Sequence, residues 1–449
     1  MAVIVPFRGV RYNPQVVGDL SAVTTPPYDV ISPEQQRRLY ARHPHNAIRL
    51  ELGMNDPGER GGEDRYTRAA AYFRNWLDSG VLAQDQAPAL YLYEQRFRLQ
   101  GDQEHTRRGI IARVRLEALG GVALPHERTL AAPKEDRFRL LRAARVNFSP
   151  IFSLYDDPSG AVLGPLEPLF AREPAAEARD DDGGEHRLWV VTDPARHHEV
   201  GRAMAPRPFV IADGHHRYET CLRFRDLMRA EHPGWTGQEG YHFALMYFCS
   251  ARDKGLCILP THRVVSRVPG LEAAALEARL RPHFDLERHP WGGSDEAAVR
   301  ARWVRRLEEV GESRPCVGVY ARGSDAYLVV TPRTGLDLDQ VLAHVPVTLR
   351  QTDVVILHEL LLRRALGLGE GELEGQLTYE RDTEEVLGEV QAGMGQLAFL
   401  LRPPRVQQVM EVALSGQTLP QKTTYFYPKL LTGLVFNPLD LDEPAAPPA

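Results

Sequence analysis

The sequence predicts an α+β fold in which strands and helices mix along a chain of 449 residues. The segments 89–99 and 106–116 flank a Gly-Asp turn and have the composition of a long β-hairpin. The stretch 207–228 passes from an apolar strand through a glycine turn into a helix. The segment 63–79 repeats apolar residues at helical spacing, which puts on one face Tyr66, Ala70, Phe73 and Leu77.

Composition restricts the class of protein. Hydrophobic residues make up 43% and charged residues 25% of the chain, which is ordinary for a globular protein with a large core, and the length favours more than one domain. The 54 Lys and Arg against 60 Asp and Glu give a formal charge of −6, so no overall cationic field exists to hold nucleic acid or an anionic membrane. The four cysteines form no CxxC pair, and no apolar run approaches the ~18 residues of a membrane span. We expect a soluble, cytoplasmic protein without a zinc knuckle or a disulfide framework.

The N-terminal elements follow from local signals. A β-rich start at 2–12 leads into a Pro-rich turn whose last residue, Ser32, can cap the next helix. Beyond the hairpin, 133–146 is predicted as a basic amphipathic helix and 149–155 as a strand. The acidic, glycine-containing stretch 175–187 is predicted as a solvated loop or linker.

The C-terminal elements alternate in the same way. We predict strands at 242–250 and 396–402, a hairpin turn at Gly323-Ser324, and helices at 271–280, 296–308, 353–366 and 384–391. These signals divide the chain into an N-terminal α+β part (1–170), a part with the glycine turn (188–335), a C-terminal α+β part (336–436) and a disordered tail (437–449).

The most informative segment is Asp213-Gly214-His215-His216-Arg217, which joins an apolar strand to a helix. A helix N-terminus favours an anion, and a glycine lets a phosphate approach the backbone. Arg217 can bind such a phosphate bidentately, while the two imidazoles add donors or positive charge. The simpler alternative is that Asp213 caps the helix and the histidines lie on the surface. Neighbours on a helix point about 100° apart, which disfavours a metal site on both histidines, although Asp213 could hold Mg²⁺ that accompanies a nucleotide.

A second polar stretch, 124–137, places His126 and Glu127 in a loop and Lys134 at the start of a helix. Glu127, or His126 beside it, could act as a general base towards a hydroxyl acceptor. Lys134 opposes the helix dipole unless an anion lies nearby, but a solvated helix face explains it as well. Asn147, just after that helix, is either a turn residue or a substrate contact.

Two further segments carry candidate ligand contacts. A Pro-Pro turn stiffens the loop that holds Tyr28 and Asp29, and Asn46 with Arg49 could bind a carboxylate or a phosphate. A Pro-rich turn with a structural tyrosine is an equal alternative. Near the C-terminus, lysines bracket the aromatic run 425–427, as in sites that stack bases and neutralise phosphates. A strand with one buried face is the simpler account of that run.

These segments together resemble a bacterial and archaeal family called domain of unknown function 1015. The resemblance covers 6–436, nearly the whole chain, and rests on PPYDVIS, PHNAIRLELG, LPHERTLAAPKEDRFRLLRAARVNFSPIFSLY, FVIADGHHRYET, DVVILHELLL and QKTTYFYPKLLTGLVF. Membership in this family implies no activity by itself.

The DGHHR loop also resembles the phosphate-binding loop of the ParB/sulfiredoxin-like fold, which includes sulfiredoxin, ParB nucleotide-binding domains and the free-serine kinases SerK and SbnI. The resemblance implies a ParB/sulfiredoxin-like core that binds ATP or ADP. Sulfiredoxin has its catalytic cysteine where this sequence has His215, which argues against sulfinic-acid reduction. ParB-type DNA binding would require a helix-turn-helix module after the loop, and no basic helical pair follows.

The motifs favour a transferase that moves phosphate from a nucleotide to a small hydroxylated metabolite, and the resemblance implies a kinase of serine metabolism. Phosphates would lie on the loop, where His216 and its neighbours neutralise developing charge while Glu127 accepts the hydroxyl proton. The alternatives are a ParB-like regulatory protein that binds or hydrolyses nucleotide, and a hydrolase in which water replaces the metabolite. The sequence leaves a homo-oligomer open.

Overall fold

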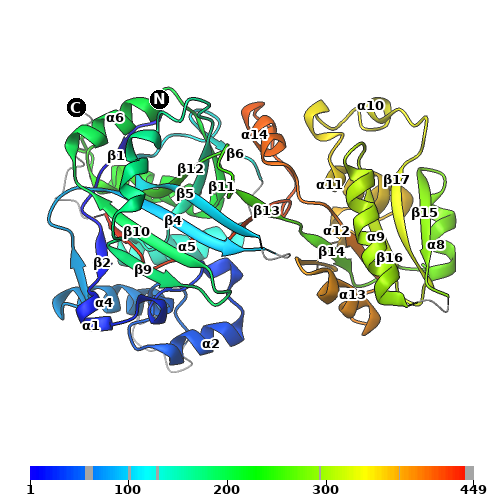
Figure 1. Ribbon diagram of the computed structural model, residues 1–449, viewed down its shortest axis with the longest axis horizontal. Helices are drawn as coiled ribbons and strands as arrows, with labels where there is room; N and C mark the ends of the chain where they lie inside the picture. Colours follow the sequence, from blue (N-terminus) through cyan, green and yellow to red (C-terminus); the bar gives the residue numbers. More distant parts are fainter. Residues whose placement is uncertain (56–63, 100–102, 128–130, 293–294, 374, 440–449) are drawn as a thin grey trace. The chain divides into compact units, whose positions relative to one another are not determined.

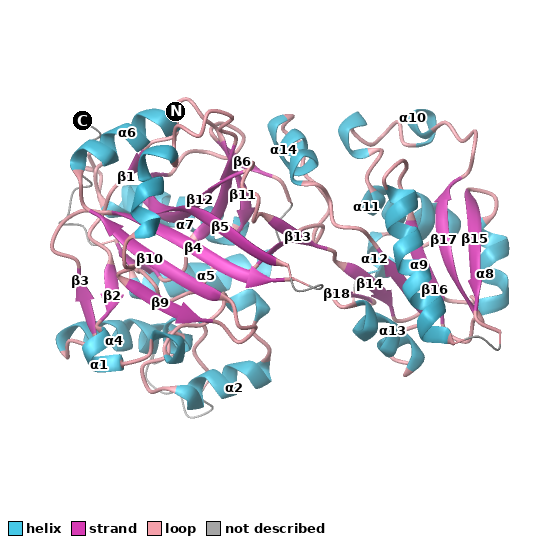
Figure 2. Cartoon of the chain, in the orientation of Figure 1, coloured by secondary structure: helices cyan, strands magenta, loops and turns pink. Residues whose placement is uncertain are grey.

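The computed structural model in Figure 1 divides into two compact units. Unit 1 comprises Met1–Cys257 and Pro428–Ala449, and unit 2 comprises Ile258–Tyr427. Within these units, the residues that the structure describes are 1–55, 64–99, 103–127, 131–292, 295–373 and 375–439. Both units combine helices with β-sheets, as Figure 2 shows, so the predicted α+β class is confirmed.

Unit 1 is built on a nine-stranded mixed sheet. Its strands are β1 (Ile4–Val5), β4 (Leu90–Arg98), β5 (Glu104–Arg115), β6 (Ala123–Pro125), β8 (Ile151–Tyr155), β9 (Ala176–Arg179), β10 (Glu185–Val191), β11 (Phe209–Asp213) and β12 (Phe243–Ser250). The order is β6-β11-β8-β12-β5-β4-β10-β9, with β1 beside β5. β11 is parallel to β6 and β12 is parallel to β8, whereas the other neighbours are antiparallel.

The described part of unit 1 also contains short strands and seven α-helices. Two small sheets pair β2 (Val10–Tyr12) with β3 (Leu82–Gln84) and β7 (Val146–Asn147) with β21 (Asn437–Pro438). The helices are α1 (Pro14–Val17), α2 (Pro33–Arg42), α3 (Ile48–Glu51), α4 (Arg65–Asp78), α5 (Ala131–Ala144), α6 (Pro194–Met204) and α7 (His215–Glu231). Ser32 caps α2 as predicted, and α5 packs against both α4 and α7.

The main core of unit 1 combines one face of the sheet with the apolar side of α7 and with residues of α5 and α6. Alternate residues of a strand point to the same face, so β5 contributes Ile110, Ala112 and Val114. Helix α7 contributes Tyr218, Cys221, Phe224 and Met228, which recur at the three- and four-residue spacing of one helix face. Burial of each large apolar side chain adds about 1.5–3 kcal/mol, and this packing fixes α7 where it leaves the glycine turn.

Unit 2 has a six-stranded antiparallel sheet in the order β15-β17-β16-β19-β14-β18. These strands are β14 (His262–Val265), β15 (Phe284–Pro290), β16 (Val317–Ala321), β17 (Ala326–Pro332), β18 (Leu377–Glu380) and β19 (Leu397–Leu400), and a separate pair is formed by β13 (Cys257–Leu259) and β20 (Tyr425–Tyr427). The α-helices are α8 (Ala273–Leu280), α9 (Glu296–Gly311), α10 (Leu338–Val341), α11 (Asp353–Val355), α12 (Glu370–Leu373), α13 (Thr383–Gln391) and α14 (Val406–Leu414). In its core, Trp303 stacks on Tyr327 with ring centroids 4.5 Å apart.

The prediction of a solvated loop at 175–187 is wrong, because these residues form β9, a tight turn and the start of β10 at the edge of the main sheet. Asp180 closes the turn, since its Oδ1 accepts the N–H groups of Asp182 at 3.0 Å and Gly184 at 2.7 Å. His186 is fully buried and bonds to Asp180 Oδ2 at 2.9 Å. The charged side chains of an edge strand concealed the strand pattern in the sequence.

The two units differ from the predicted parts of the chain. Strands β10, β11 and β12 join the sheet that begins in the N-terminal part, so the predicted part 188–335 is divided between the units. The predicted tail 437–449 begins inside the fold, because Asn437 and Pro438 are buried and pair with β7. The remainder of that tail, 440–449, lies outside the described residues.

Two other features of the helices bear on the predictions. The predicted helix 353–366 is α11 followed by a π-helix, Ile356–Ala365, and this wider helix buries the three consecutive leucines Leu360, Leu361 and Leu362. Across the described ranges, none of the helices combines the length and the apolar character needed to cross a membrane.

Candidate functional site

The glycine turn at the end of β11 is the centre of the candidate site. Gly214 has a φ of +89°, a left-handed conformation that favours glycine, and it directly precedes α7. A Cβ at this position would come within 2.8 Å of the Arg217 guanidinium. The turn therefore requires glycine both for its backbone conformation and for the close approach of Arg217.

Helix α7 is 17 residues long, and no side chain caps its N-terminus. The first N–H groups of a helix have no partner within the helix, and the positive end of the helix dipole favours an anion beside them. The alternative in which Asp213 caps this helix is therefore wrong. Its carboxylate faces two cations instead.

Asp213 anchors both of these cations. Arg217 Nη2 donates to Asp213 Oδ2 at 2.8 Å, and Lys429 Nζ donates to Oδ1 at 2.8 Å. Burial alone would raise the pKa of Asp213, but the charges of Lys429 and Arg217 outweigh burial and hold that pKa well below its usual range. The carboxylate stays ionised and fixes an ammonium and a guanidinium beside the glycine turn.

Arg217 is held on its other side by the segment before β8. Its Nη1 donates to Ser149 Oγ at 3.1 Å and to the Pro150 carbonyl at 2.7 Å. Its Nε is buried and has no hydrogen-bond partner among the residues that the structure describes, an arrangement that costs about 1–3 kcal/mol. A cavity of about 40 Å³ adjoins this arginine, large enough for water, and its lining includes Glu51, Arg137, Asn147, Ser149 and Cys221.

His126 and His215 lie against each other beside the turn. Their ring centroids are 4.8 Å apart, and the backbone N–H of His126 donates to Nε2 of His215 at 3.3 Å. The fully buried His126 ring bonds through Nδ1 to the Ile211 carbonyl at 2.6 Å. Burial lowers the pKa of His126 to about 4 and lowers that of His215 well below its usual range. Both rings are neutral at pH 7 and supply hydrogen bonds rather than positive charge.

Glu127 follows His126 at the end of β6, which pairs in parallel with β11. Its Oε2 lies 3.9 Å from Nε2 of His126, and its side chain is 16% exposed. The partly exposed carboxylate of Glu127 thus lies next to the buried, neutral ring of His126. The backbone N–H of that same histidine donates to His215. The parallel pairing of β6 and β11 is what brings the two sequence motifs together.

The loop of Tyr28 and Asp29 also approaches Arg217. Burial would lower the pKa of Arg217, but the charges of Asp213, Asp29 and Glu51 raise it above its usual value. Tyr28 lies under Arg137, whose Cζ is 4.0 Å from the ring centroid. Asp29 is exposed to solvent, so the loop presents a carboxylate to the surroundings of the site.

Lys134 lies near the start of α5 and contacts α7 beyond the glycine turn. Its Nζ donates to Glu219 Oε2 at 2.7 Å, and Glu219 follows Arg217 on the same helix. The ion pair joins α5 to α7 and accounts for a basic residue near the start of α5. We therefore assign Lys134 to the attachment of the two helices rather than to a ligand.

Asn46, Arg49 and Asn147 make hydrogen bonds that explain them without a ligand. The buried Asn46 amide donates to the carbonyls of Ala22 and Thr24 and accepts the N–H of Ile48. Arg49 donates to the carbonyls of Pro44 and Tyr40. Asn147 accepts the N–H of Leu245 and the amide of Asn437. These three side chains hold loops and strands in place, and we do not include them in the proposed site.

No group of three or more His, Cys, Asp and Glu side chains is placed to hold a metal ion in the part of the chain that the structure describes. Both carboxylate oxygens of Asp213 already accept from cations. The Mg²⁺ contact of Asp213 with a bound nucleotide stays a prediction.

We predict that the free energy of unfolding falls as the pH is lowered from about 6.5 to 4, because His126 is neutral in the folded chain. The unfolded chain, with a histidine pKa near 6.5, binds the proton before the folded chain does, where the pKa is about 4. This share of stability is complete above pH 6.5 and is lost as the pH falls toward the folded pKa.

The variant His126→Asn keeps a donor for the Ile211 carbonyl but does not titrate. Urea unfolding at pH 7 and pH 4.5 should show a loss of stability that is smaller than the wild-type loss by about 2 kcal/mol. His198→Asn, which changes an exposed histidine on α6, should retain the wild-type loss. Equal losses in His126→Asn and wild type would contradict a neutral buried ring.

Comparison with known proteins gives one family and several distant structures. A family model described as "Protein of unknown function (DUF1015)" matches residues 4–355, and no curated protein matches. A conserved hypothetical protein from Pyrococcus furiosus aligns with 71% of this chain and 92% of its own, at 14% identity and a TM-score of 0.34. A free serine kinase in complex with AMP aligns over 70% and 86%, at 13% identity and a TM-score of 0.34. SbnI with a C-terminal truncation, from Staphylococcus aureus, aligns over 73% and 87%, at 12% identity and a TM-score of 0.35.

Proposed function

This chain belongs to the DUF1015 family of proteins of unknown function, and we propose that it transfers a phosphoryl group from ATP or ADP to the hydroxyl group of a small metabolite. We place the nucleotide phosphates at the turn formed by Gly214 and the first residues of α7. We also propose that the sheet around β11 is a ParB/sulfiredoxin-like core, as the resemblance of the DGHHR loop implies.

One observation carries the proposal: two cations are fixed on Asp213 at 2.8 Å each, beside a long helix that begins without a side-chain cap. A helix N-terminus and a guanidinium are both groups that bind phosphate in proteins. Asp213 holds Arg217 and Lys429 in one geometry before a ligand arrives, which reduces the entropy lost on binding.

The hydrogen bonding of the Arg217 guanidinium leaves a donor for an oxygen acceptor beside it. Its buried Nε–H lacks a partner among the described residues, and its Nη2 is directed to Asp213. A phosphate oxygen near the turn would accept from this guanidinium and from the N–H groups at the start of α7. His215 and His216 open that helix, so their backbone N–H groups are part of the same end.

In the proposed reaction the acceptor oxygen forms a bond to the terminal phosphorus while the bond from that phosphorus to the bridging oxygen breaks. ATP then leaves as ADP, and ADP leaves as AMP. The fixed cations and helix N–H groups stabilise the charge on the transferring group. Glu127 takes the hydroxyl proton, with His126 beside it at 3.9 Å.

Free serine is the acceptor that we propose first, because the loop Asp213–Arg217 resembles that of free-serine kinases. The test is to incubate the purified chain with ATP or ADP and Mg²⁺, together with serine or another hydroxylated metabolite, and to follow phosphorus-31 resonances. We expect a phosphate monoester that forms only with nucleotide and acceptor present.

Other products would point to the alternatives. Inorganic phosphate formed at the same rate with and without acceptor would identify a hydrolase. Nucleotide binding without any turnover across the acceptor panel would favour a regulatory protein and would end the kinase proposal. Phosphorylation of another hydroxyl compound but not of serine would retain the reaction and change the acceptor.

A further inference from the structure

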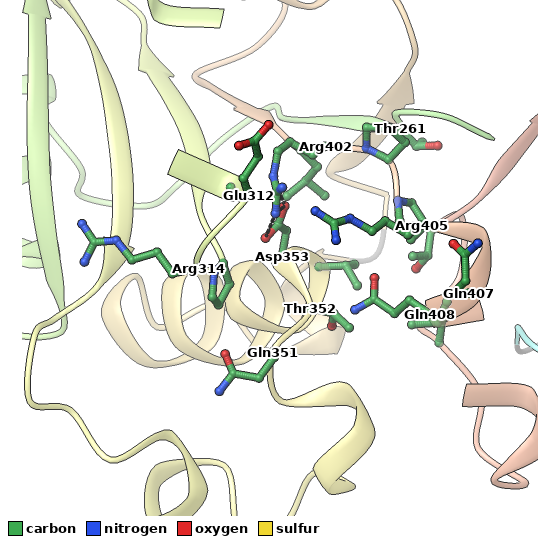
Figure 3. A pocket seen from close by; sticks show the side chains of 18 of the residues that line it. Thr261, Glu312, Arg314, Gln351, Thr352, Asp353, Arg402, Arg405, Gln407 and Gln408 are labelled. Atoms are coloured by element: carbon green, nitrogen blue, oxygen red, sulfur yellow. Dashed lines mark hydrogen bonds and ion pairs between the residues drawn. The ribbon is translucent and has the colours of Figure 1, made fainter. Parts of the chain in front are cut away.

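Unit 2 contains a cavity whose lining residues are remote in sequence from the glycine turn. Its volume is about 550 Å³, which is within the range of small-molecule sites. Its walls come from the end of α9, the segment before α11, the segment after β19 and the first turns of α14. Figure 3 shows that polar and charged side chains dominate these walls.

An ion pair fixes one wall of this cavity. Arg402 donates from Nε at 3.0 Å and from Nη2 at 3.1 Å to the two oxygens of Asp353. The Asp353 carboxylate is 9% exposed and also accepts the N–H of Cys316 at 3.0 Å. A Cβ on Gly311 would clash with Arg402 Nε, so glycine at the end of α9 leaves the space that the guanidinium occupies. Arg402 is thus placed rigidly, and it has five N–H donors of which two serve Asp353.

A second guanidinium faces the same space. Arg405 is exposed, and its side chain makes no hydrogen bond or ion pair with any residue in the described ranges. Figure 3 shows that the side chains of Arg405 and Gln408 point toward the other lining side chains, on the side of Arg402 and Asp353. In the same view, Arg314 points away from them. Arg402 is neutralised by Asp353, so Arg405 brings an uncompensated positive charge to this side of the cavity.

Arg405 also stands at the N-cap of α14, a nine-residue helix. No side chain caps this helix, and its first turn contains no acidic residue. The N–H of Val409 bonds to the Arg405 carbonyl, which leaves the first N–H groups of the helix, those of 406–408, without helical partners. Three kinds of donor therefore meet at one side of the cavity: the guanidinium paired with Asp353, the exposed guanidinium of Arg405 and a helix N-terminus.

Two carboxylates and several neutral groups complete the lining. Glu312 lies on the far side of Arg402 and is directed away from Arg405 in Figure 3, while Glu411 lies one turn farther along α14. The neutral polar groups are Thr261, Ser313, Gln351, Thr352, Gln407, Gln408 and Thr423. The anion-binding side thus opens onto a region that hydrogen-bonds uncharged polar groups, and the volume exceeds what a bare phosphate ion fills.

We propose that this cavity binds a small metabolite that carries an oxyanion, either a carboxylate or a phosphate, on a hydroxylated body. Arg402, Arg405 and the first turn of α14 hold the oxyanion, and the amide and hydroxyl side chains hold the body. All of these residues belong to unit 2, so the site stands or falls independently of phosphoryl transfer at the glycine turn.

Hydrogen exchange measured by mass spectrometry on the full chain tests the proposal, with three probes that share one carbon skeleton. Glycerol phosphate carries a phosphate, glycerate carries a carboxylate, and glycerol carries no charge; all are used at millimolar concentration and equal ionic strength. We expect glycerol phosphate, glycerate or both to slow exchange in the peptide that contains 406–408 by about threefold once the probe exceeds twice its Kd. Glycerol should leave this exchange unchanged.

Two variants separate the site from a general salt effect. Arg405→Gln removes the second guanidinium and should abolish the protection. Arg314→Gln removes an exposed arginine that also lines the cavity but points away, and it should keep the protection. The proposal is overturned if neither anion protects 406–408, if glycerol protects equally, or if Arg405→Gln behaves as wild type. Protection confined to the peptide that contains Asp213–Arg217 would likewise overturn it, and would leave the proposed function intact.

Discussion

Arg217→Ala is expected to weaken the binding of ATP or ADP by about 1.5–3 kcal/mol, which is about 10- to 150-fold in Kd. The side chain is buried against Asp213, Ser149 and Pro150, so it cannot be replaced by solvent in the bound state. Its removal takes away a charge-assisted donor to phosphate and also frees Asp213 from one of its two cations. The remaining carboxylate charge would then repel a phosphate that approaches the turn.

Titration calorimetry with each nucleotide measures this loss. Because a buried ion pair also stabilises the fold, Arg207→Ala is the matched control. Arg207 makes the same kind of contact, with Asp157 at 2.7 Å in unit 1, but that pair precedes β11 and does not involve the turn. Both variants should unfold at lower urea concentration than wild type, and only Arg217→Ala should lose nucleotide affinity.

A third variant tests the geometry of the contact. Arg217→Lys keeps the positive charge but cannot donate to Asp213, Ser149 and a phosphate from one planar group. We expect an affinity between that of wild type and that of Arg217→Ala. If Arg217→Ala binds nucleotide as tightly as wild type, the phosphates do not lie at this turn and the proposed function loses its central contact.

The sequence was sufficient for elements whose signals are local. The hairpin of β4 and β5 follows from two alternating segments around one turn, and the passage from β11 through Gly214 into α7 follows from an apolar run, a glycine and a helical repeat. In each case one short stretch contains both the residues and their partners. Hydrophobic periodicity and turn chemistry then suffice.

The sequence could not identify contacts made across the fold. Lys429 reaches Asp213 over a separation of 216 residues, and nothing in the run of lysines and aromatics around it selects this lysine over Lys422. Of the two interpretations of that aromatic run, the strand is confirmed, because Tyr425–Tyr427 form β20. Only the pairing of distant segments in unit 1 shows which basic residue completes the turn.

Polar residues that bond to other groups of the chain were a second reason why the predicted site differs from the site in the structure. Asn46 and Asn147 have the side chains expected of ligand contacts, yet their amides satisfy buried backbone groups. The same hydrogen-bonding capacity serves either purpose. A sequence shows that a donor is present but does not show whether a backbone carbonyl has already taken it.

The predicted domain boundaries differ from those of the two units for a related reason. The acidic stretch around Asp180 has the composition of a linker, but β9 and β10 on either side of it belong to the main sheet. The chain instead divides after Cys257 and again before Pro428. A segment that leaves a unit and returns to it produces no composition change at either crossing, so contacts alone define the two units.

Glu127→Gln is expected to separate affinity from rate, with nucleotide and acceptor binding retained and turnover lowered by about 10²- to 10⁴-fold. Glutamine keeps the length and much of the hydrogen bonding of glutamate but cannot accept the hydroxyl proton. The Glu127 side chain is 16% exposed and lies 3.9 Å from the buried His126, so it combines access to a substrate with a rigid neighbour.

Single-turnover measurements at saturating nucleotide and acceptor report the chemical step, and calorimetry reports binding in the same variant. Glu135→Gln is the matched control, because it changes a carboxylate on the following helix whose exposed side chain pairs with Arg223 at 2.6 Å. The control should leave the rate at the wild-type value. A pH profile distinguishes a base from a positioning group, since loss of a base removes the acidic limb of the rate profile while loss of a positioning contact lowers the rate at every pH.

A wild-type rate in Glu127→Gln would exclude this carboxylate as the base. His126 would not be the automatic successor, because its Nδ1 is bonded to the Ile211 carbonyl and burial holds its pKa at about 4, which makes its ring a weak base. Asp29 would then deserve the same substitution, since its exposed carboxylate lies near enough to Arg217 to raise the pKa of that guanidinium. A reduced rate in Asp29→Asn together with a wild-type rate in Glu127→Gln would move the base from the β6 side of the turn to the Tyr28–Asp29 loop, and the phosphate site at Gly214 would be unchanged.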